Sequence, residues 1–299
     1  MLNLLQFDFF QGRSCSRTRD RFVPLLLLEQ RRYFQRRILK QQIQKIYEAG
    51  GIDRELTVVT PTALAIGKFD GTHLGHRKLL RELRKSAEKH RLRSLVLILN
   101  VPGKSVADRT LRKEKILSMG IDYCIEYPLD DELKNMTAEE FLEKILVKRL
   151  CMKFMVAGKD LTFGKNREGN ADFLKTHAAE YGIGFKLIDK VTETETGCEI
   201  SSSLIRDLIR EGDMERASAL LGAPYTFAGV VKHGKHIGTD VMGVPTANIS
   251  VDPGRELPPF GVYAARITVF GLEEKKLSPR EMTGMLTAGP LLFFAIGMA

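Results

Sequence analysis

The sequence predicts an α/β fold with a parallel sheet, followed by a smaller all-β module. Short apolar runs alternate with amphipathic helical segments, a pattern typical of parallel sheets. After residue 222 the helical period ends, and strand-like runs with Gly- and Pro-rich turns follow. At 299 residues the chain is long enough for two cores. We therefore expect an α/β domain over 55–222, a β module over 223–299, and a basic extension over 1–54 that is not part of the fold.

Each predicted element follows from its hydrophobic period. Short runs of four to eight residues rich in apolar side chains predict strands, and apolar spacings of three and four predict helices. Thr137 and Glu140 form a capping box that marks one helix start, and Gly212 separates the last two helices. The expected strands are 63–66, 94–99, 154–157, 184–188, 226–231 and 262–269, and the expected helices are 77–92, 137–150, 171–181, 201–210 and 213–221.

Composition excludes several classes of protein. The net charge is +9, but residues 1–50 hold ten Lys/Arg against four Asp/Glu, so the remainder is nearly balanced and unlike a nucleic-acid-binding body. The apolar run Phe22–Leu28 is too short to span a bilayer. Four cysteines show no metal spacing, which fits free thiols in a reducing cytoplasm. We expect a cytoplasmic protein with no nucleic-acid or membrane partner; the sequence does not indicate an oligomeric state.

The segment GKFDGTHLGH, Gly67–His76, carries the clearest chemical signal. It lies where a predicted strand passes into a helix N-terminus, and free N–H groups at such an end favour bound phosphate. His73 and His76 are three residues apart, so both can face one phosphate. Glycines at 67, 71 and 75 allow close backbone approach. The competing interpretation is a solvated turn with two incidental histidines. The segment is neither a Walker loop nor a dinucleotide fingerprint.

HxGH after a strand is the signature of the nucleotidylyltransferase superfamily, and the longer string resembles the bacterial bifunctional riboflavin kinase/FAD synthetases. Three later segments resemble the same family in the same order. They are the loop AGKDLTFGKNREGN at 157–170, the helical ISSSLIRDLIREGDMERASALLGAPY at 200–225, and the PTAN-containing GVVKHGKHIGTDVMGVPTANI at 229–249. The resemblance covers about residues 64–270. It implies a Rossmann-like nucleotidylyltransferase domain followed by a β-barrel kinase module.

The resemblance also implies a reaction and its residues. FMN would attack the α-phosphorus of ATP in line, giving FAD and pyrophosphate, with Mg²⁺ as cofactor. His73, His76 and Arg206 would act on the phosphates. Asp160 would orient ribose or help hold Mg²⁺, although an exposed turn Asp explains it equally well. Ser201, a member of the nucleotide-binding set, could also be an ordinary N-cap. That set comprises Gly67, Phe69, Asp70, Gly71, Gly75, Asp160, Ser201, Ser202 and Ser203.

Two departures from the family pattern affect the expected activity. Residues 99–103 stand in place of a TF[DE]PHP segment that belongs to the flavin side of the site, which makes FMN affinity the weaker expectation. In the kinase module, Thr246 and Asn248 match residues that hold Mg²⁺ and ATP. Likeness fades after about Phe270, and the segment with the family's general-base Glu has no match. We therefore expect an incomplete barrel with unpaired strand edges, and weak or absent riboflavin phosphorylation.

Two other functions remain open at this point. One is a nucleotidylyltransferase that acts on another phosphorylated acceptor, such as phosphopantetheine or glycerol phosphate; the PTAN and 200–225 segments count against it. The other is a catalytically dead remnant that binds flavin or nucleotide. The intact His73, His76 and Arg206 count against that second possibility. The favoured small-molecule partners are ATP and FMN, with riboflavin as a further substrate.

Overall fold

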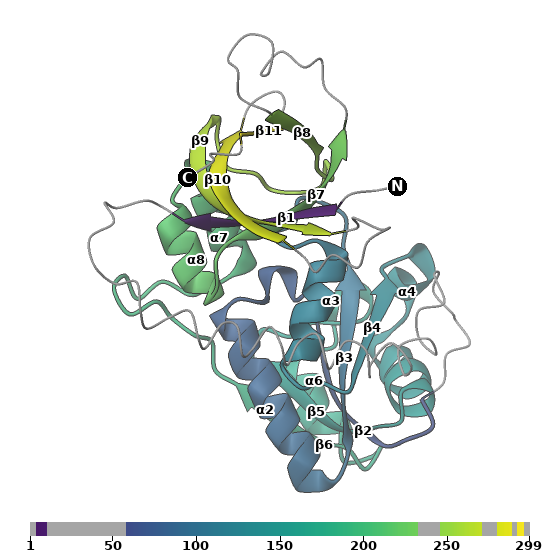
Figure 1. Ribbon diagram of the computed structural model, residues 1–299. Helices are drawn as coiled ribbons and strands as arrows, with labels where there is room; N and C mark the ends of the chain where they lie inside the picture. The colour runs from purple at the N-terminus through teal and green to yellow at the C-terminus, as the bar shows by residue number, and fades with distance from the viewer. Residues whose placement is uncertain (1–3, 11–57, 233–245, 271–279, 289–291, 296–299) are drawn as a thin grey trace.

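The computed structural model describes residues 4–10, 58–232, 246–270, 280–288 and 292–295 (Figure 1). Its α/β domain is built on a five-stranded sheet of order β4-β3-β2-β5-β6, in which all paired neighbours run parallel. This confirms the predicted parallel sheet. The strands are β2 Thr62–Gly67, β3 Arg93–Asn100, β4 Tyr123–Pro128, β5 Met152–Gly158 and β6 Gly184–Ile188.

The two faces of the sheet carry separate hydrophobic cores. On β2, Ala63 and Ala65 face the core that contains Leu80 and Leu83 of α2. Neighbouring residues of a strand point to opposite faces, and the next residue, Leu64, belongs to the other core. Small side chains on the first face let a long helix lie close to the sheet. The helices are α2 Leu74–His90, α3 Arg109–Ser118, α4 Asp131–Asn135, α5 Ala138–Glu140, α6 Ala171–His177, α7 Ser202–Glu211 and α8 Met214–Leu221, with short 3₁₀ turns η1 Asp70–Thr72 and η3 Lys165–Arg167.

The capping box at Thr137 is present, with the Thr137 and Glu140 side chains each bonded to the other residue's backbone N–H. From Phe141 the helix continues to Arg149 as a wider π-helical segment, η2. Sequence patterns did not predict β4, α3 or α4. Strand β4 lies at the sheet edge and includes Glu126 and Pro128, so it lacks the continuous apolar run of its neighbours.

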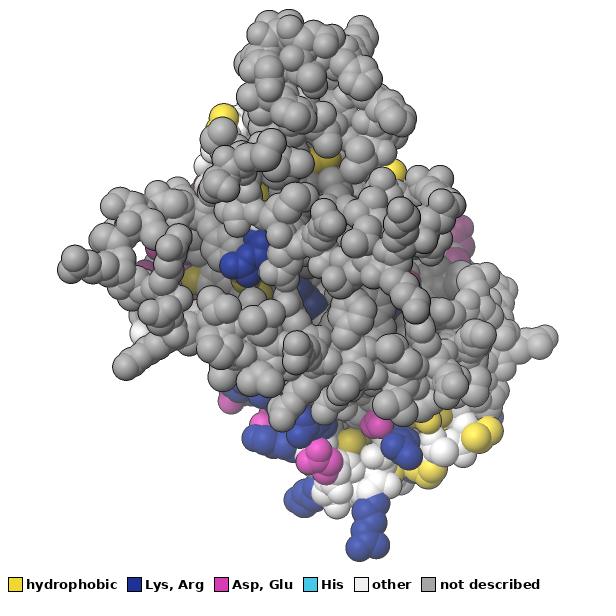
Figure 2. Space-filling view, in the orientation of Figure 1, with side chains coloured by type: hydrophobic (Ala, Val, Ile, Leu, Met, Phe, Trp, Pro, Cys, Tyr) yellow, Lys and Arg dark blue, Asp and Glu magenta, His cyan; other side chains and the backbone are white. Residues whose placement is uncertain are grey.

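The outer face of α2 is covered by charged pairs. Lys85 contacts Glu82 at 3.0 Å, and Arg84 contacts Glu88 at 3.0 Å. Basic and acidic side chains are likewise interspersed at the lower end of the molecule in Figure 2. Such exposed pairs each contribute only a few tenths of a kcal/mol. They make this face an ordinary solvated helix surface.

The β module is a closed antiparallel barrel of order β1-β7-β8-β11-β10-β9. One strand of the barrel, β1, comes from the N-terminal end of the sequence. It pairs with both β7 and β9. Figure 1 shows this strand crossing the barrel at its lower rim. The barrel strands are β1 Leu4–Phe10, β7 Thr226–Lys232, β8 Thr246–Ser250, β9 Gly261–Phe270, β10 Arg280–Ala288 and β11 Leu292–Ala295.

Strand β1 overturns two expectations. Residues 4–10 are part of the fold, whereas we expected 1–54 to lie outside it; residues 11–54 are outside the described part. The expected unpaired edge is filled, because the β7 and β9 edges both bond to β1. The physical reason is that a short extended segment, LLQFDFF, satisfies backbone N–H and C=O groups that an open sheet leaves exposed. The basic residues that follow this segment conceal its strand pattern in the sequence.

The two modules share a junction. Helices α7 and α8 form one core with Tyr225, Phe227, Ile249 and Ala265 of the β module. The loop after β3 pairs with the segment before β9: Ser105 N–H donates to the Gly254 carbonyl at 2.8 Å, and the Ser105 carbonyl accepts from Glu256 N–H at 3.0 Å. The loop that follows residues 99–103, where the sequence departs from the family pattern, is thus bonded to the β module.

Candidate active site

The GKFDGTHLGH turn lies at the carboxyl end of β2. Phe69, Gly71 and Thr72 have φ angles of 48°, 79° and 49°, so three of four successive residues are left-handed. A Cβ at Gly71 would lie 2.8 Å from Cγ1 of Val106, which leaves room there only for glycine. This tight turn places His73 at the N-cap of α2.

The rings of His73 and His76 stack on each other at the start of α2. Their centroids are 3.8 Å apart and their planes differ by 26°. A Cβ at Gly75 would lie 3.1 Å from the His73 ring, so the third glycine of the motif gives that ring its space. The Nδ1 atoms of both rings are buried and have no hydrogen-bond partner. Two hydrogen-bonding atoms are therefore uncommitted beside a helix N-terminus.

Both imidazoles are uncharged at neutral pH. Burial lowers the pKa of His73 to about 4 and outweighs the opposing attraction of Asp160. The pKa of His76 is held well below its usual value by burial, and further by His73 and by the Arg112 guanidinium. An anionic phosphate would favour the protonated form and raise both pKa values. The two imidazoles are thus suited to take up protons only when an anionic ligand binds beside them.

Asp70 connects three parts of the site. One carboxylate oxygen accepts hydrogen bonds from the backbone N–H groups of Val106 at 2.8 Å and Ala107 at 3.1 Å. The other accepts from Nη1 of Arg206 at 3.1 Å, and the Asp70 carbonyl accepts from Oγ of Ser202 at 2.8 Å. We expected Asp70 among the nucleotide-binding residues. Its side chain holds the turn, the loop after β3 and α7 together, and its contact with nucleotide stays a prediction.

The serine cluster begins α7. Oγ of Ser201 accepts from Leu204 N–H at 3.2 Å, so Ser201 is an ordinary N-cap, as the alternative interpretation predicts. Ser203 Oγ accepts from Nη2 of Arg206 at 2.9 Å. Arg206, 26% exposed, is therefore fixed by Ser203 and Asp70. Phosphate binding by these serines stays a prediction.

Asp160 lies in the loop after β5, on the same sheet edge as the histidines. It is exposed, and its Oδ2 is 3.7 Å from Nζ of Lys190. A Cβ at Gly158 would lie 2.5 Å from Oδ1 of Asp160, so Gly158 makes room for this carboxylate. Asp160 acts on His73 through its charge. It remains available to solvent and to a ligand.

Arg112 on α3 was missed by sequence reasoning. It is 6% exposed and donates to the Lys68 carbonyl at 3.1 Å, to Asn100 Oδ1 at 2.8 Å and to Glu126 Oε1 at 3.0 Å. Recognising α3 as a helix would have revealed it, because Arg112 is four residues from Ile116 and shares the buried face of that helix. A buried arginine is unusual enough to require a specific partner.

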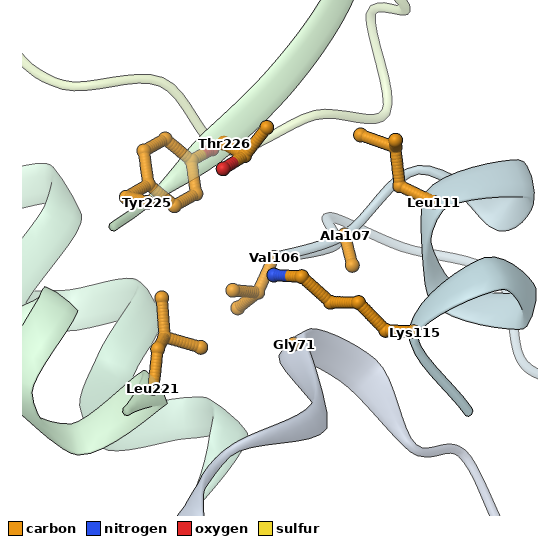
Figure 3. A pocket seen from close by; sticks show the side chains of 8 residues that line it. All are labelled: Gly71, Val106, Ala107, Leu111, Lys115, Leu221, Tyr225 and Thr226. Carbon is orange, nitrogen blue, oxygen red and sulfur yellow. The ribbon is translucent and has the colours of Figure 1, made fainter. Parts of the chain in front are cut away.

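A small pocket lies against the back of the Gly71 turn, between α3, α8 and β7 (Figure 3). Its walls are mainly apolar, and Lys115 extends across it toward Val106 in the figure. Neither histidine lines it, so this pocket is separate from the stacked rings. Its lining residues are Gly71, Val106, Ala107, Leu111, Lys115, Leu221, Tyr225 and Thr226.

Thr246 and Asn248 lie on β8, two residues apart and hence on one face of the strand. Asn248 is in register with Lys232 of β7 and Phe293 of β11. The side chains of Thr246 and Asn248 lie outside what the structure describes, so their role in holding Mg²⁺ and ATP stays a prediction.

The described residues contain neither a metal-binding cluster nor a membrane-spanning helix. No group of three or more His, Cys, Asp or Glu side chains is arranged there to hold a metal ion. No helix within the described ranges has the length and apolar character needed to cross a membrane. The described cysteines, Cys124, Cys151 and Cys198, are free thiols.

Comparison with known proteins accounts for this arrangement. The FAD synthetase family model matches residues 56–204, and the riboflavin kinase family model matches residues 221–293. The second match extends past Phe270, where we expected likeness to fade. The chain belongs to the bifunctional riboflavin kinase/FMN adenylyltransferase family. Its α/β domain is accordingly that of an FMN adenylyltransferase.

Individual relatives agree with the family assignment. The bifunctional riboflavin kinase/FMN adenylyltransferase of Escherichia coli (strain K12) is 36% identical over 225 residues, covering 72% of this chain and 70% of the relative. The protein of the same name from Haemophilus influenzae is 35% identical over 228 residues, covering 73% and 72%. A crystal structure described as a macrolide-efflux protein from Streptococcus pneumoniae is similar with a TM-score of 0.69 and 26% identity, covering 81% of each chain.

Proposed function

We propose that this protein transfers AMP from ATP to FMN, giving FAD and pyrophosphate, in the cytoplasm. The observation that carries the proposal is the stacked pair His73 and His76, with both Nδ1 atoms unpartnered at the N-terminus of α2. A site that must stabilise charge on phosphorus needs such donors in place before reaction. The motif lies at the carboxyl edge of a parallel sheet, where ligands of such folds bind.

The transfer requires no covalent enzyme intermediate. An oxygen of the FMN phosphate forms a bond to the α-phosphorus of ATP, and the bond from that phosphorus to the pyrophosphate oxygen breaks. His73 and His76 donate hydrogen bonds to the phosphate oxygens as charge accumulates. Arg206 supplies fixed positive charge, oriented by Asp70 and Ser203. Catalysis is then mostly positioning and charge neutralisation.

Mg²⁺ is expected to enter with ATP, since this cation is usually held by substrate phosphates and one or two carboxylates. Asp160 fits that role, because it is an exposed oxygen donor at the same sheet edge. When bound, the ion would neutralise phosphate charge. The chain's own residues would orient the phosphates.

The test is to incubate purified protein with FMN plus MgATP and to measure FAD and pyrophosphate. His73→Ala and His76→Ala should each lower turnover by ~10²-fold or more, as loss of a transition-state donor does. His90→Ala is the matched control, because His90 is exposed at the other end of α2, stacked on Phe154. An unchanged rate in both motif variants would sink the proposal. Product formed only with another phosphorylated acceptor would favour the alternative transferase.

A further inference from the structure

Arg112 connects three strand ends beneath the histidine motif. Lys68 directly follows β2, Asn100 ends β3, and Glu126 lies on β4. The guanidinium donates to an oxygen of each, at 3.1, 2.8 and 3.0 Å respectively. One buried side chain thus joins the carboxyl ends of three neighbouring strands at the site.

The charge on Arg112 is balanced inside the protein. Burial would raise the pKa of Glu126, but hydrogen bonds from Arg112 and Lys113 hold that pKa below its usual value, so the carboxylate stays ionised. Lys113 contacts the second Glu126 oxygen at 3.1 Å. A rigid guanidinium fork can serve several acceptors at once, which a lysine ammonium does less well. The arrangement is therefore geometrically specific.

We propose that Arg112 is a positioning residue for the transferase reaction, because it fixes the Lys68–Phe69 turn and through it the ring of His76. The contact path is short. Arg112 holds the Lys68 carbonyl, and the next residue, Phe69, places its ring 5.1 Å from the His76 ring. Arg112 is not assigned a contact with the reacting atoms. The inference rests on the proposed adenylyl transfer and adds a residue outside its motifs.

The same residue influences the protonation of His76. Burial is the main cause of the lowered His76 pKa, and the charges of His73 on α2 and Arg112 on α3 add to it. Glu126 pairs with both Arg112 and Lys113, and the charge of Asp160 acts on His73. Removing the Arg112 charge should therefore raise the His76 pKa while burial still keeps it below the usual value. A residue that only filled space would not cause this shift.

The experiment compares three variants in the full chain. Arg112→Gln removes the charge, Arg112→Lys keeps it with fewer contacts, and Arg109→Gln changes an exposed arginine on the same helix. Arg112→Gln should lower kcat by about tenfold or more, as small misplacements of reacting groups do, and change the KM for ATP by less than about threefold. Arg112→Lys should recover part of the kcat, and Arg109→Gln should match the parent.

The second readout is the His76 pKa, measured by NMR titration of the ring without substrate. It should rise in Arg112→Gln and stay near the parent value in Arg112→Lys. An unchanged kcat together with an unchanged His76 pKa in Arg112→Gln would overturn the proposal. If Arg112→Gln does not fold, Asn100→Ala takes its place, because it removes one acceptor of the Arg112 guanidinium. A parental kcat in both Asn100→Ala and Arg112→Lys would then overturn the proposal. Absence of FAD formation by the parent would refute the proposed function instead, and the titration would still test Arg112.

Discussion

The two modules differ in how far apart in sequence their essential parts lie. In the α/β domain, strand β2, the turn and α2 follow one another over residues 62–90 and present both histidines. In the β module, closure requires Leu4–Phe10 to pair with Thr226–Lys232 and Gly261–Phe270. A site carried by one strand–turn–helix unit can be predicted from a short motif. A barrel completed by a distant strand cannot, because no local pattern specifies which segment fills an open edge.

The largest expected difference between the modules is catalytic. Riboflavin phosphorylation is predicted to be weaker than adenylyl transfer, because loss of a general base commonly costs ~10²–10⁴-fold. On β9, β10 and β11, the strands that follow the PTAN segment, Glu281 is the one carboxylic residue. The measurement is FMN formation from riboflavin and MgATP. The control carries Thr246→Ala and Asn248→Ala.

FMN formation well above that control would contradict the prediction and show that the β module is competent. In that case Glu281→Gln becomes the decisive variant. Loss of FMN formation in Glu281→Gln would identify Glu281 as the general base. Unchanged FMN formation would assign proton transfer to another group.

The next prediction separates the modules by stability. Phe7→Pro should unfold the barrel at lower temperature, because proline removes an N–H donor from a strand paired on both sides, with Phe227 and Ile267 opposite. FAD formation should stay within about twofold, since Asp70 and Ser202 anchor the Arg206 helix to the α/β domain.

Likewise, a chain starting near Ile52 should keep its specific activity in FAD formation. Calorimetry and the FAD assay measure the two effects.

Gln6→Thr is the matched control, because a β-branched residue keeps the strand. Loss of FAD formation in Phe7→Pro, with the α/β domain still folded, would show that the barrel supports the transferase site. The first residues would then have a role in catalysis that their sequence did not indicate.

Sequence patterns predicted where the histidine motif lies in the fold but not the bonding that supports it. GKFDGTHLGH placed His73 and His76 correctly on a helix start, since the period and the glycines are local. The commitment of Asp70 to Val106 and Ala107 N–H groups depends on a loop 36 residues away. Arg112 was missed for a related reason: its partners come from three different strands, and only the folded sheet brings those strand ends together. Tertiary contacts of this kind leave no short motif.

The third prediction concerns pH and the α/β domain alone. His73 has a pKa of about 4 when folded, below its unfolded value of 6.5, so only the unfolded chain takes up its proton between these values. This contribution to stability is complete above about pH 6.5 and falls by about 3 kcal/mol as pH drops toward 4. Urea unfolding at pH 7.5, 5.5 and 4.5 should show a steeper loss in the parent than in His73→Gln. Parallel curves would mean that His73 is not buried as neutral imidazole.

The smallest expected effect is at the junction, and it tests whether the two modules are energetically independent. Oδ2 of Asp108 accepts from Ala228 N–H at 3.1 Å and lies 4.0 Å from Nη1 of Arg255, whose side chain is 1% exposed. Nε and Nη1 of Arg255 have no hydrogen-bond partner, so Asp108 is the nearby opposite charge for a buried guanidinium. Asp108→Asn keeps an acceptor for Ala228 and removes the charge. It should lower stability by about 1 kcal/mol.

The unfolding transition that shifts in Asp108→Asn shows whether the two modules are energetically independent. Asp131→Asn, at an exposed carboxylate on α4, controls for general loss of charge. If Asp108→Asn lowers the unfolding temperatures of both modules together, the junction couples them, and the loop after β3 is held in place by the barrel it contacts. If only the barrel transition moves, the α/β domain keeps its loop through Asp70 alone, and the site described above is self-contained. A parental unfolding profile would mean that the Asp108–Arg255 pair, 4.0 Å apart, contributes little to the stability of either module.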